Sequence, residues 1–94
     1  MGTGPIDVEP LDCLLLYMRR NCHLCEDMME QLEELRVVHS FTVEQRDVDD
    51  DPLWRQEYGD RVPVLMFKQT VICQYYLDRK LLLDVIVSAI SAGQ

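Results

Sequence analysis

The sequence predicts a single α/β domain with its elements in the order β-α-β-α-β-β-α. Residues 14–18 form a short continuous apolar run, which is typical of a strand buried on both faces of a sheet. From residue 22 onward apolar residues recur at helical spacing, and the apolar runs 64–67 and 71–75 are separated by a hairpin-length connection. The chain of 94 residues has room for one core. These observations predict a four-stranded mixed sheet covered by three helices.

The first half of the chain is predicted to fold as a strand, a helix and a second strand. The helix is amphipathic, with acidic residues mostly opposite an apolar stripe formed by Leu24, Met28, Leu32 and Leu35. Residues 41–48 alternate in part between apolar and polar types, which favours a strand that ends in an acidic turn.

The second half is predicted to form a short helix, a hairpin and a last helix. Asp51 can cap the short helix, Pro52 suits its first position and Gly59 is a candidate terminator. Asp78 can cap the last helix, whose apolar stripe consists of Leu81, Leu82, Val85, Ile86, Ala89 and Ile90. The domain is expected to span residues 13–92, and the Gly- and Pro-containing residues 1–12 are expected to be loosely ordered.

Composition excludes several classes of function. Apolar residues at 48% and charged residues at 28% are ordinary for a globular protein. The net charge of −8 argues against binding to nucleic acid or to an acidic membrane surface. The sequence has no apolar stretch long enough for a membrane span and no secretory-signal pattern at its start, so we expect a cytoplasmic location.

The motif Cys22-His23-Leu24-Cys25 falls between the first strand and the first helix, and it predicts redox chemistry. Two cysteines three residues apart on a helix share a face and can close a local disulfide. Cys22, at or next to the N-cap, lies where free amide groups and the helix dipole favour a thiolate, so it is the predicted nucleophile. Cys25 is the predicted resolving thiol.

The residues around the dithiol are assigned lesser roles. Arg19 and Arg20 are expected to support an anion at Cys22, and His23 is given no catalytic role. The other two cysteines, Cys13 and Cys73, fall in or beside predicted strands, so they are interpreted as structural. The acidic run 47–51 lacks the ligand pattern of a calcium loop and is interpreted as a solvated turn and helix cap.

The chain resembles the glutaredoxin branch of the thioredoxin fold over residues 13–92, most of all the small glutaredoxin-like proteins. The residues that carry the resemblance are the strand 14–18, Arg19, the dithiol 22–25, Asp47-Val48-Asp49 and Val62-Pro63-Val64. The resemblance implies that Pro63 is cis and that Val62 offers its backbone N–H and C=O to an extended substrate. It also implies substrate-binding roles for Arg19 and Asp78.

The chain departs from the glutaredoxin pattern in two places. His23-Leu24 replaces the usual Pro-Tyr between the cysteines. Tyr75-Tyr76-Leu77-Asp78 stands where glutaredoxins carry a Gly-Gly turn and an acidic residue that hold glutathione, and bulky rings there oppose close backbone approach. Asp78 therefore has two open interpretations, as a carboxylate that meets a substrate amino group and as a plain helix cap.

The predicted function is a thiol-disulfide oxidoreductase of glutaredoxin-like type. The expected partners are protein or small-molecule disulfides, with glutathione a candidate reductant, no resident cofactor or metal, and a monomeric chain. Two alternatives use the same cysteines differently. One is an iron-sulfur or metal carrier, which needs two further ligands. The other is a non-catalytic thioredoxin-fold binding module in which the disulfide is structural.

Overall fold

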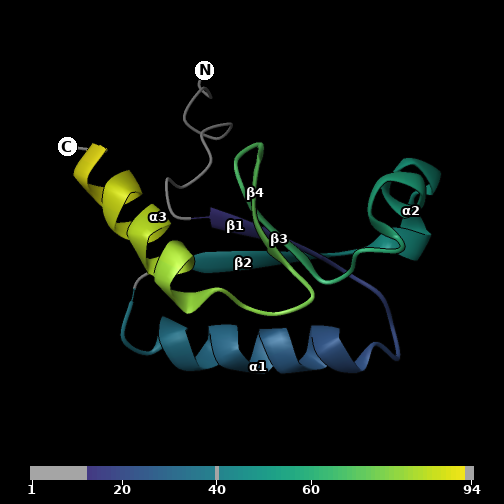
Figure 1. Ribbon diagram of the computed structural model, residues 1–94, viewed down its shortest axis with the longest axis horizontal. Coiled ribbons are helices and arrows are strands. Elements are labelled where there is room, and N and C mark those ends of the chain that lie inside the picture. The colour runs from purple at the N-terminus through teal and green to yellow at the C-terminus, as the bar shows by residue number, and fades with distance from the viewer. Residues whose placement is uncertain (1–12, 40, 93–94) are drawn as a thin grey trace, which may run out of the picture.

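The computed structural model describes residues 13–39 and 41–92, so the expectation for residues 1–12 lies outside the described part of the chain. The element order is the predicted one (Figure 1). The elements are β1 (Cys13–Met18), α1 (His23–Arg36), β2 (Thr42–Asp47), the 3-10 helix η2 (Val48–Asp50), α2 (Pro52–Tyr58), β3 (Val64–Phe67), β4 (Thr70–Gln74) and α3 (Arg79–Ala92).

The strands form a four-stranded mixed sheet in the order β2-β1-β3-β4. The β1 and β2 strands are parallel, because α1 carries the chain back to the end of the sheet at which β1 begins. The β3 strand is antiparallel to both β1 and β4. The register pairs Tyr17 with Val64 and Val64 with Gln74, and a bulge between Leu65 and Met66 shifts the β3–β4 pairing. This is the architecture of a thioredoxin-like α/β fold, as predicted.

Alternating residues of the strands divide the interior into two layers. On one face, Leu14 and Leu16 of β1 and Leu65 of β3 pack with Met28 of α1 and Leu82 of α3. The other face holds a smaller cluster of Tyr17, Val48, Val64 and Met66, against which Trp54 and Tyr58 of α2 pack. The two 14-residue helices therefore cover one face, and the short α2 covers the other.

Several strand boundaries differ from the sequence prediction by a residue, and two of these differences have identifiable reasons. Val48 was expected in the second strand, but its side chain is fully buried in η2, where the Asp47 carboxylate accepts a hydrogen bond from the Asp49 amide at 2.9 Å. Tyr75 was expected in the fourth strand, but its φ of 67° lies in the left-handed region, so the strand ends at Gln74.

The topology brings four chain segments together at the edge of the sheet where the parallel strands β1 and β2 end. The carboxyl end of β1 lies beside that of β2, and it also pairs with the start of β3, which in turn pairs with the end of β4. The dithiol segment, the acidic run, the Val62-Pro63 segment and the Tyr75–Asp78 segment follow or precede these strand ends. The sequence segments chosen as functional therefore meet at this edge. In the described part of the chain, no helix is both long and apolar enough to cross a membrane.

Candidate functional site

The dithiol lies where α1 begins, and Cys22 is the N-cap of that helix. Its backbone is extended (φ −105°, ψ 107°), and its Sγ accepts a hydrogen bond from the Cys25 amide at 3.2 Å. The two cysteines form a disulfide with their Cα atoms 5.2 Å apart. The Cys25 side chain is 3% exposed, whereas Cys22 is only partly buried. The more accessible sulfur is thus the one placed at the helix N-terminus.

A tight turn after β1 positions this cap. Asn21, the residue before Cys22, has a φ of 58°, a left-handed conformation that asparagine tolerates better than most residues. The Glu26 amide then donates to the Cys22 carbonyl at 3.0 Å, which closes the first helical turn. Asn21 was not among the predicted site residues, although an asparagine directly before the dithiol is a usable signal for such a turn.

The two arginines before the dithiol are engaged with carboxylates. Arg19 binds Asp49 through two hydrogen bonds of 3.1 and 3.2 Å, and its third contact is the Gly59 carbonyl at 3.4 Å. Arg20 pairs with Asp47 at 3.2 Å. Because these carboxylates compensate both positive charges, the amides that begin α1 are the main local support for an anion at Cys22.

Asp49 and Gly59 connect the dithiol segment to α2. The Arg19 guanidinium holds the pKa of Asp49 below its usual range, and Arg55 of α2 adds a second ion pair at 3.1 Å. Gly59 has an ordinary helical φ of −54°, so it does not end α2 through a left-handed turn. A Cβ at Gly59 would lie 2.5 Å from the Arg55 carbonyl oxygen and 3.2 Å from Arg19 Nη2, so glycine is required here for close approach.

The segment before β3 has the conformation that the resemblance implied. The Val62–Pro63 peptide bond is cis, and the Pro63 carbonyl accepts a hydrogen bond from the Tyr75 amide at 2.9 Å. Within residues 13–39 and 41–92, the backbone N–H and C=O of Val62 have no hydrogen-bond partner. Free main-chain groups next to a strand are the groups that an added extended chain can use.

Asp78 performs the capping role that was one of its two interpretations. Its Oδ1 accepts a hydrogen bond from the Leu81 amide at 3.0 Å, and its carbonyl accepts from Leu82 at 3.0 Å. The carboxylate is therefore partly used by α3, and a contact with a substrate amino group stays a prediction.

The other cysteines differ from the dithiol in their surroundings. Cys13 and Cys73 are free thiols in β1 and β4, and both are partly buried. Burial raises the pKa of the Cys73 thiol, which disfavours the reactive thiolate, in accord with the structural role expected for it. His23 has 85% of its side chain exposed, and its nearest acidic partner is Asp27 at 3.6 Å.

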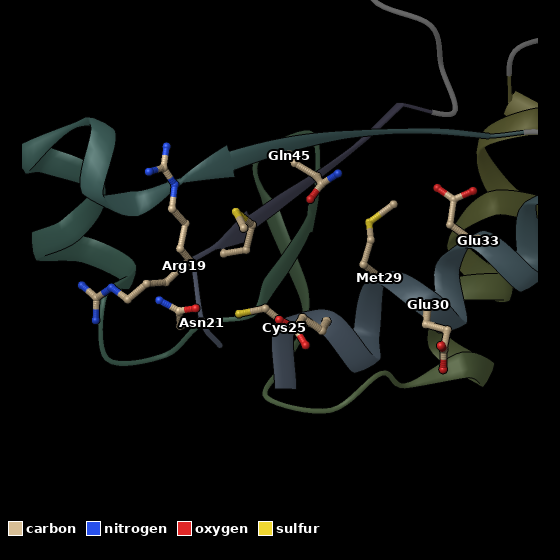
Figure 2. Close-up of a pocket in the computed structure, with 10 residues that line it drawn as sticks. Arg19, Asn21, Cys25, Met29, Glu30, Glu33 and Gln45 are labelled. Carbon is tan, nitrogen blue, oxygen red and sulfur yellow. The ribbon is translucent and has the colours of Figure 1, made fainter. Parts of the chain in front are cut away.

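A pocket of about 330 Å³ opens beside Cys25, between α1 and the ends of β1 and β2. Figure 2 shows Met29 of α1 extending toward Gln45 of β2, while Glu30 points away from that strand. The residues lining the pocket are Met18, Arg19, Arg20, Asn21, Cys25, Glu26, Met29, Glu30, Glu33 and Gln45. The pocket is not predictable from the sequence, because it depends on how closely α1 lies to the sheet.

A metal site needs several ligand side chains held close together. Among residues 13–39 and 41–92, no group of three or more His, Cys, Asp and Glu side chains is arranged to hold a metal ion. The cysteines that could contribute ligands, Cys22 and Cys25, are joined to each other in this structure.

Comparisons with known proteins agree with this fold. The family model described as Glutaredoxin-like domain (DUF836) matches residues 13–87. Protein Ne2328 from Nitrosomonas europaea is 34% identical with a TM-score of 0.72, and the match covers 84% of this chain and 94% of that one. Protein XcR50 from X. campestris is 28% identical with a TM-score of 0.60, covering 86% and 97% of the two chains.

A more distant similarity concerns the fold alone. Thioredoxin 1 from Thermosipho africanus TCF52B has a TM-score of 0.59 at 15% identity, and the match covers 86% of this chain and 97% of that chain. None of the curated proteins compared with the chain matched it. The family match over residues 13–87, together with the thioredoxin-like sheet and the capped dithiol, shows that this chain belongs to the glutaredoxin-like family.

Proposed function

We propose that the protein is a thiol-disulfide oxidoreductase of glutaredoxin-like type, with Cys22 as nucleophile and Cys25 as resolving thiol. The observation that carries this proposal is the position of Cys22, whose partly accessible Sγ caps α1 and accepts the Cys25 amide hydrogen bond. A thiolate at this position gains a charge-assisted hydrogen bond and the favourable end of the helix dipole.

The proposed reaction transfers two electrons from the dithiol to a substrate disulfide. The Cys22 thiolate attacks one substrate sulfur, forming a mixed disulfide and releasing the other substrate sulfur as a thiolate that takes up a proton. Cys25 then loses its proton and attacks Cys22 Sγ, which releases the second substrate thiol and closes the Cys22–Cys25 disulfide. A thiol reductant, for which glutathione is the candidate, reverses these steps and restores the dithiol.

Substrate binding is assigned to the Val62-Pro63 segment before β3. The unpaired main-chain groups of Val62, next to cis-Pro63, support docking of an extended segment that carries the target disulfide. Arg19 supports this arrangement as a bridge, since it links the segment before the dithiol to Gly59, three residues before Val62. The need for a reducing compartment to restore the dithiol leads us to infer a cytoplasmic location. We also propose a monomeric working form, because the proposed reaction uses only residues of one chain.

The test is a redox titration in glutathione buffers, combined with trapping by single-cysteine variants. We expect the wild-type dithiol to equilibrate with the buffer and to reduce a small neutral disulfide, 2-hydroxyethyl disulfide. Cys22→Ser should lose this activity, while Cys25→Ser should accumulate a mixed disulfide at Cys22 that mass spectrometry detects. A Cys22→Ser protein that reduced the disulfide at the wild-type rate would overturn the assignment.

The same preparation distinguishes the metal-carrier alternative. Anaerobic reconstitution with iron and sulfide should leave the protein colourless and its size unchanged if the dithiol serves exchange chemistry. Visible absorbance together with a dimer would favour a cluster held between two chains.

A further inference from the structure

The end of β4 presents a tyrosine in an unfavourable backbone conformation. Tyr75 has a φ of 67°, in the left-handed region that glycine and asparagine adopt most readily. Its side chain is 42% exposed, so the conformation is not explained by burial of the ring in the core. Strained residues that persist at the surface near a reactive group are a reason to look for a functional cause.

Two hydrogen bonds hold Tyr75 against the segment before β3. Its amide donates to the Pro63 carbonyl at 2.9 Å, and its hydroxyl donates to the Asp60 carbonyl at 2.9 Å. The two accepting carbonyls belong to the first and last residues of the segment 60–63. The Tyr75 side chain therefore runs along this segment, which contains Val62. The ring therefore borders the unpaired main-chain groups assigned to substrate docking.

The next residue in the chain is a second exposed tyrosine. Tyr76 has 71% of its side chain exposed, and its amide donates to the Gln74 carbonyl at 2.6 Å, which keeps the turn tight. Tyrosines offer a large and rigid contact area with little conformational entropy to lose, which is why they are enriched at recognition surfaces. The turn that carries Tyr76 leads directly to Asp78, whose carboxylate caps α3 by accepting a hydrogen bond from the Leu81 amide.

We propose that Tyr75 and Tyr76 determine substrate specificity, selecting polypeptide disulfides with an apolar residue next to the attacked cysteine over glutathione disulfide. This inference rests on the proposed function. In this proposal, a substrate segment that docks at Val62 lies against the two rings. An apolar residue next to the substrate cysteine then buries its surface against them. The glutathione tripeptide has no apolar neighbour of its cysteine to bury, and it meets the Tyr75 ring where its backbone would approach Val62.

The test compares three oxidised substrates in single-turnover reactions of the reduced protein, quenched with acid and analysed by mass spectrometry. Two are short disulfide-linked peptides that differ only in the neighbours of cysteine, leucine in one and serine in the other. The third is glutathione disulfide, and 2-hydroxyethyl disulfide reports intrinsic reactivity. We expect wild type to react about tenfold faster with the leucine peptide than with the serine peptide, the size of effect that modest apolar contacts produce.

Three variants assign this preference to the rings. Tyr76→Ala should reduce the leucine-to-serine ratio to about two while reacting normally with 2-hydroxyethyl disulfide. Tyr75→Gly should accelerate the reaction with glutathione disulfide about fivefold or more, because it removes the ring and suits the left-handed backbone. The control is Val38→Ala, an exposed apolar position (75%) beyond the far end of α1, which should change none of the ratios.

The outcomes separate this inference from the function on which it rests. Equal ratios in wild type and Tyr76→Ala, with normal reduction of 2-hydroxyethyl disulfide, would overturn the specificity role and leave the oxidoreductase intact. Failure of wild type to reduce any of the four disulfides would reject both. Thermal unfolding of each variant checks that the rate changes do not come from a disrupted fold.

Discussion

The helices α1 and α3 have the same length and begin at the same edge of the sheet, but their caps differ in chemistry. In α3 the Asp78 carboxylate accepts the amide hydrogen bond of the residue three positions later, Leu81, at 3.0 Å. In α1 the sulfur of Cys22 makes the equivalent bond to Cys25 at 3.2 Å. A neutral sulfur is a weak acceptor and a thiolate is a strong one.

This difference couples the start of α1 to redox state. The α3 cap is satisfied by a group that is ionised at neutral pH, so it contributes to stability without taking part in chemistry. The hydrogen bond that caps α1 is strong only when Cys22 is an anion. The start of the helix therefore favours ionisation of the Cys22 thiol, and the neutral thiol stabilises the helix less. Under the proposed function, the same local structure therefore serves folding in α3 and reactivity in α1.

The largest expected effect comes from giving α1 the type of cap that α3 has. Cys22→Asp should lower the rate of disulfide reduction by at least about 10³-fold, because the carboxylate is not a thiol nucleophile. In reducing buffer at about pH 5, where less of Cys22 is ionised than at neutral pH and the new carboxylate stays ionised, its free energy of unfolding should exceed that of reduced wild type by up to about 1 kcal/mol, because a carboxylate is a better N-cap than a neutral thiol. Urea denaturation with Cys22→Ser as a neutral-cap control measures this. A loss of stability in Cys22→Asp would contradict the comparison.

The next largest effect is a difference in alkylation rate between two cysteines of the same chain. In the reduced protein, Cys22 should be alkylated by iodoacetamide at least about tenfold faster than Cys73 at pH 7, since each unit of pKa difference changes the thiolate fraction tenfold. Burial raises the pKa of Cys73, so its reaction should keep accelerating above pH 9. Peptide mass spectrometry after timed quenching follows both sites. Equal rates at the two cysteines would remove the basis for Cys22 as nucleophile.

A smaller effect tests the carboxylate cap of α3 and its second interpretation. Asp78→Ala should lower the free energy of unfolding by about 1 kcal/mol, while Asp78→Asn should stay within about 0.3 kcal/mol of wild type, because asparagine caps as well as aspartate does. If the carboxylate also contacts a substrate amino group, Asp78→Asn should raise KM for peptides with a free amino group and leave KM for acetylated ones unchanged. An Asp78→Ala protein with the free energy of unfolding of wild type would show that this cap does not contribute to stability.

The smallest effect concerns the ion pairs that connect the α1 side to α2. Arg19 lowers the pKa of Asp49 in the folded state, so this carboxylate stabilises the fold above its ordinary pKa of 3.8 and ceases to do so as the pH falls through the lowered value. Asp49→Asn should therefore be less stable than wild type at pH 7, with the difference shrinking toward pH 3. Denaturation midpoints at pH 7, 4 and 3 measure this, with the neighbouring Asp50→Asn as control. A difference independent of pH would mean that charge is not its cause.

The sequence was sufficient to predict the element order, the mixed sheet and the position of the dithiol at a helix start. Those features follow from local signals: the apolar run 14–18, the helical spacing after Cys22 and the capping residues Asp51 and Asp78. Each signal acts within a few residues of the chain, where spacing and side-chain type determine the backbone conformation.

Only the tertiary structure decided how these segments interact. The sequence could not show that Arg19 is used by Asp49 and Gly59, thirty and forty residues away, or that the Tyr75 hydroxyl reaches the Asp60 carbonyl. Nor could it reveal the pocket beside Cys25, which depends on the spacing between α1 and the sheet. Such contacts depend on strand register and helix packing, which place distant residues together to within an ångström, and no local pattern encodes that placement.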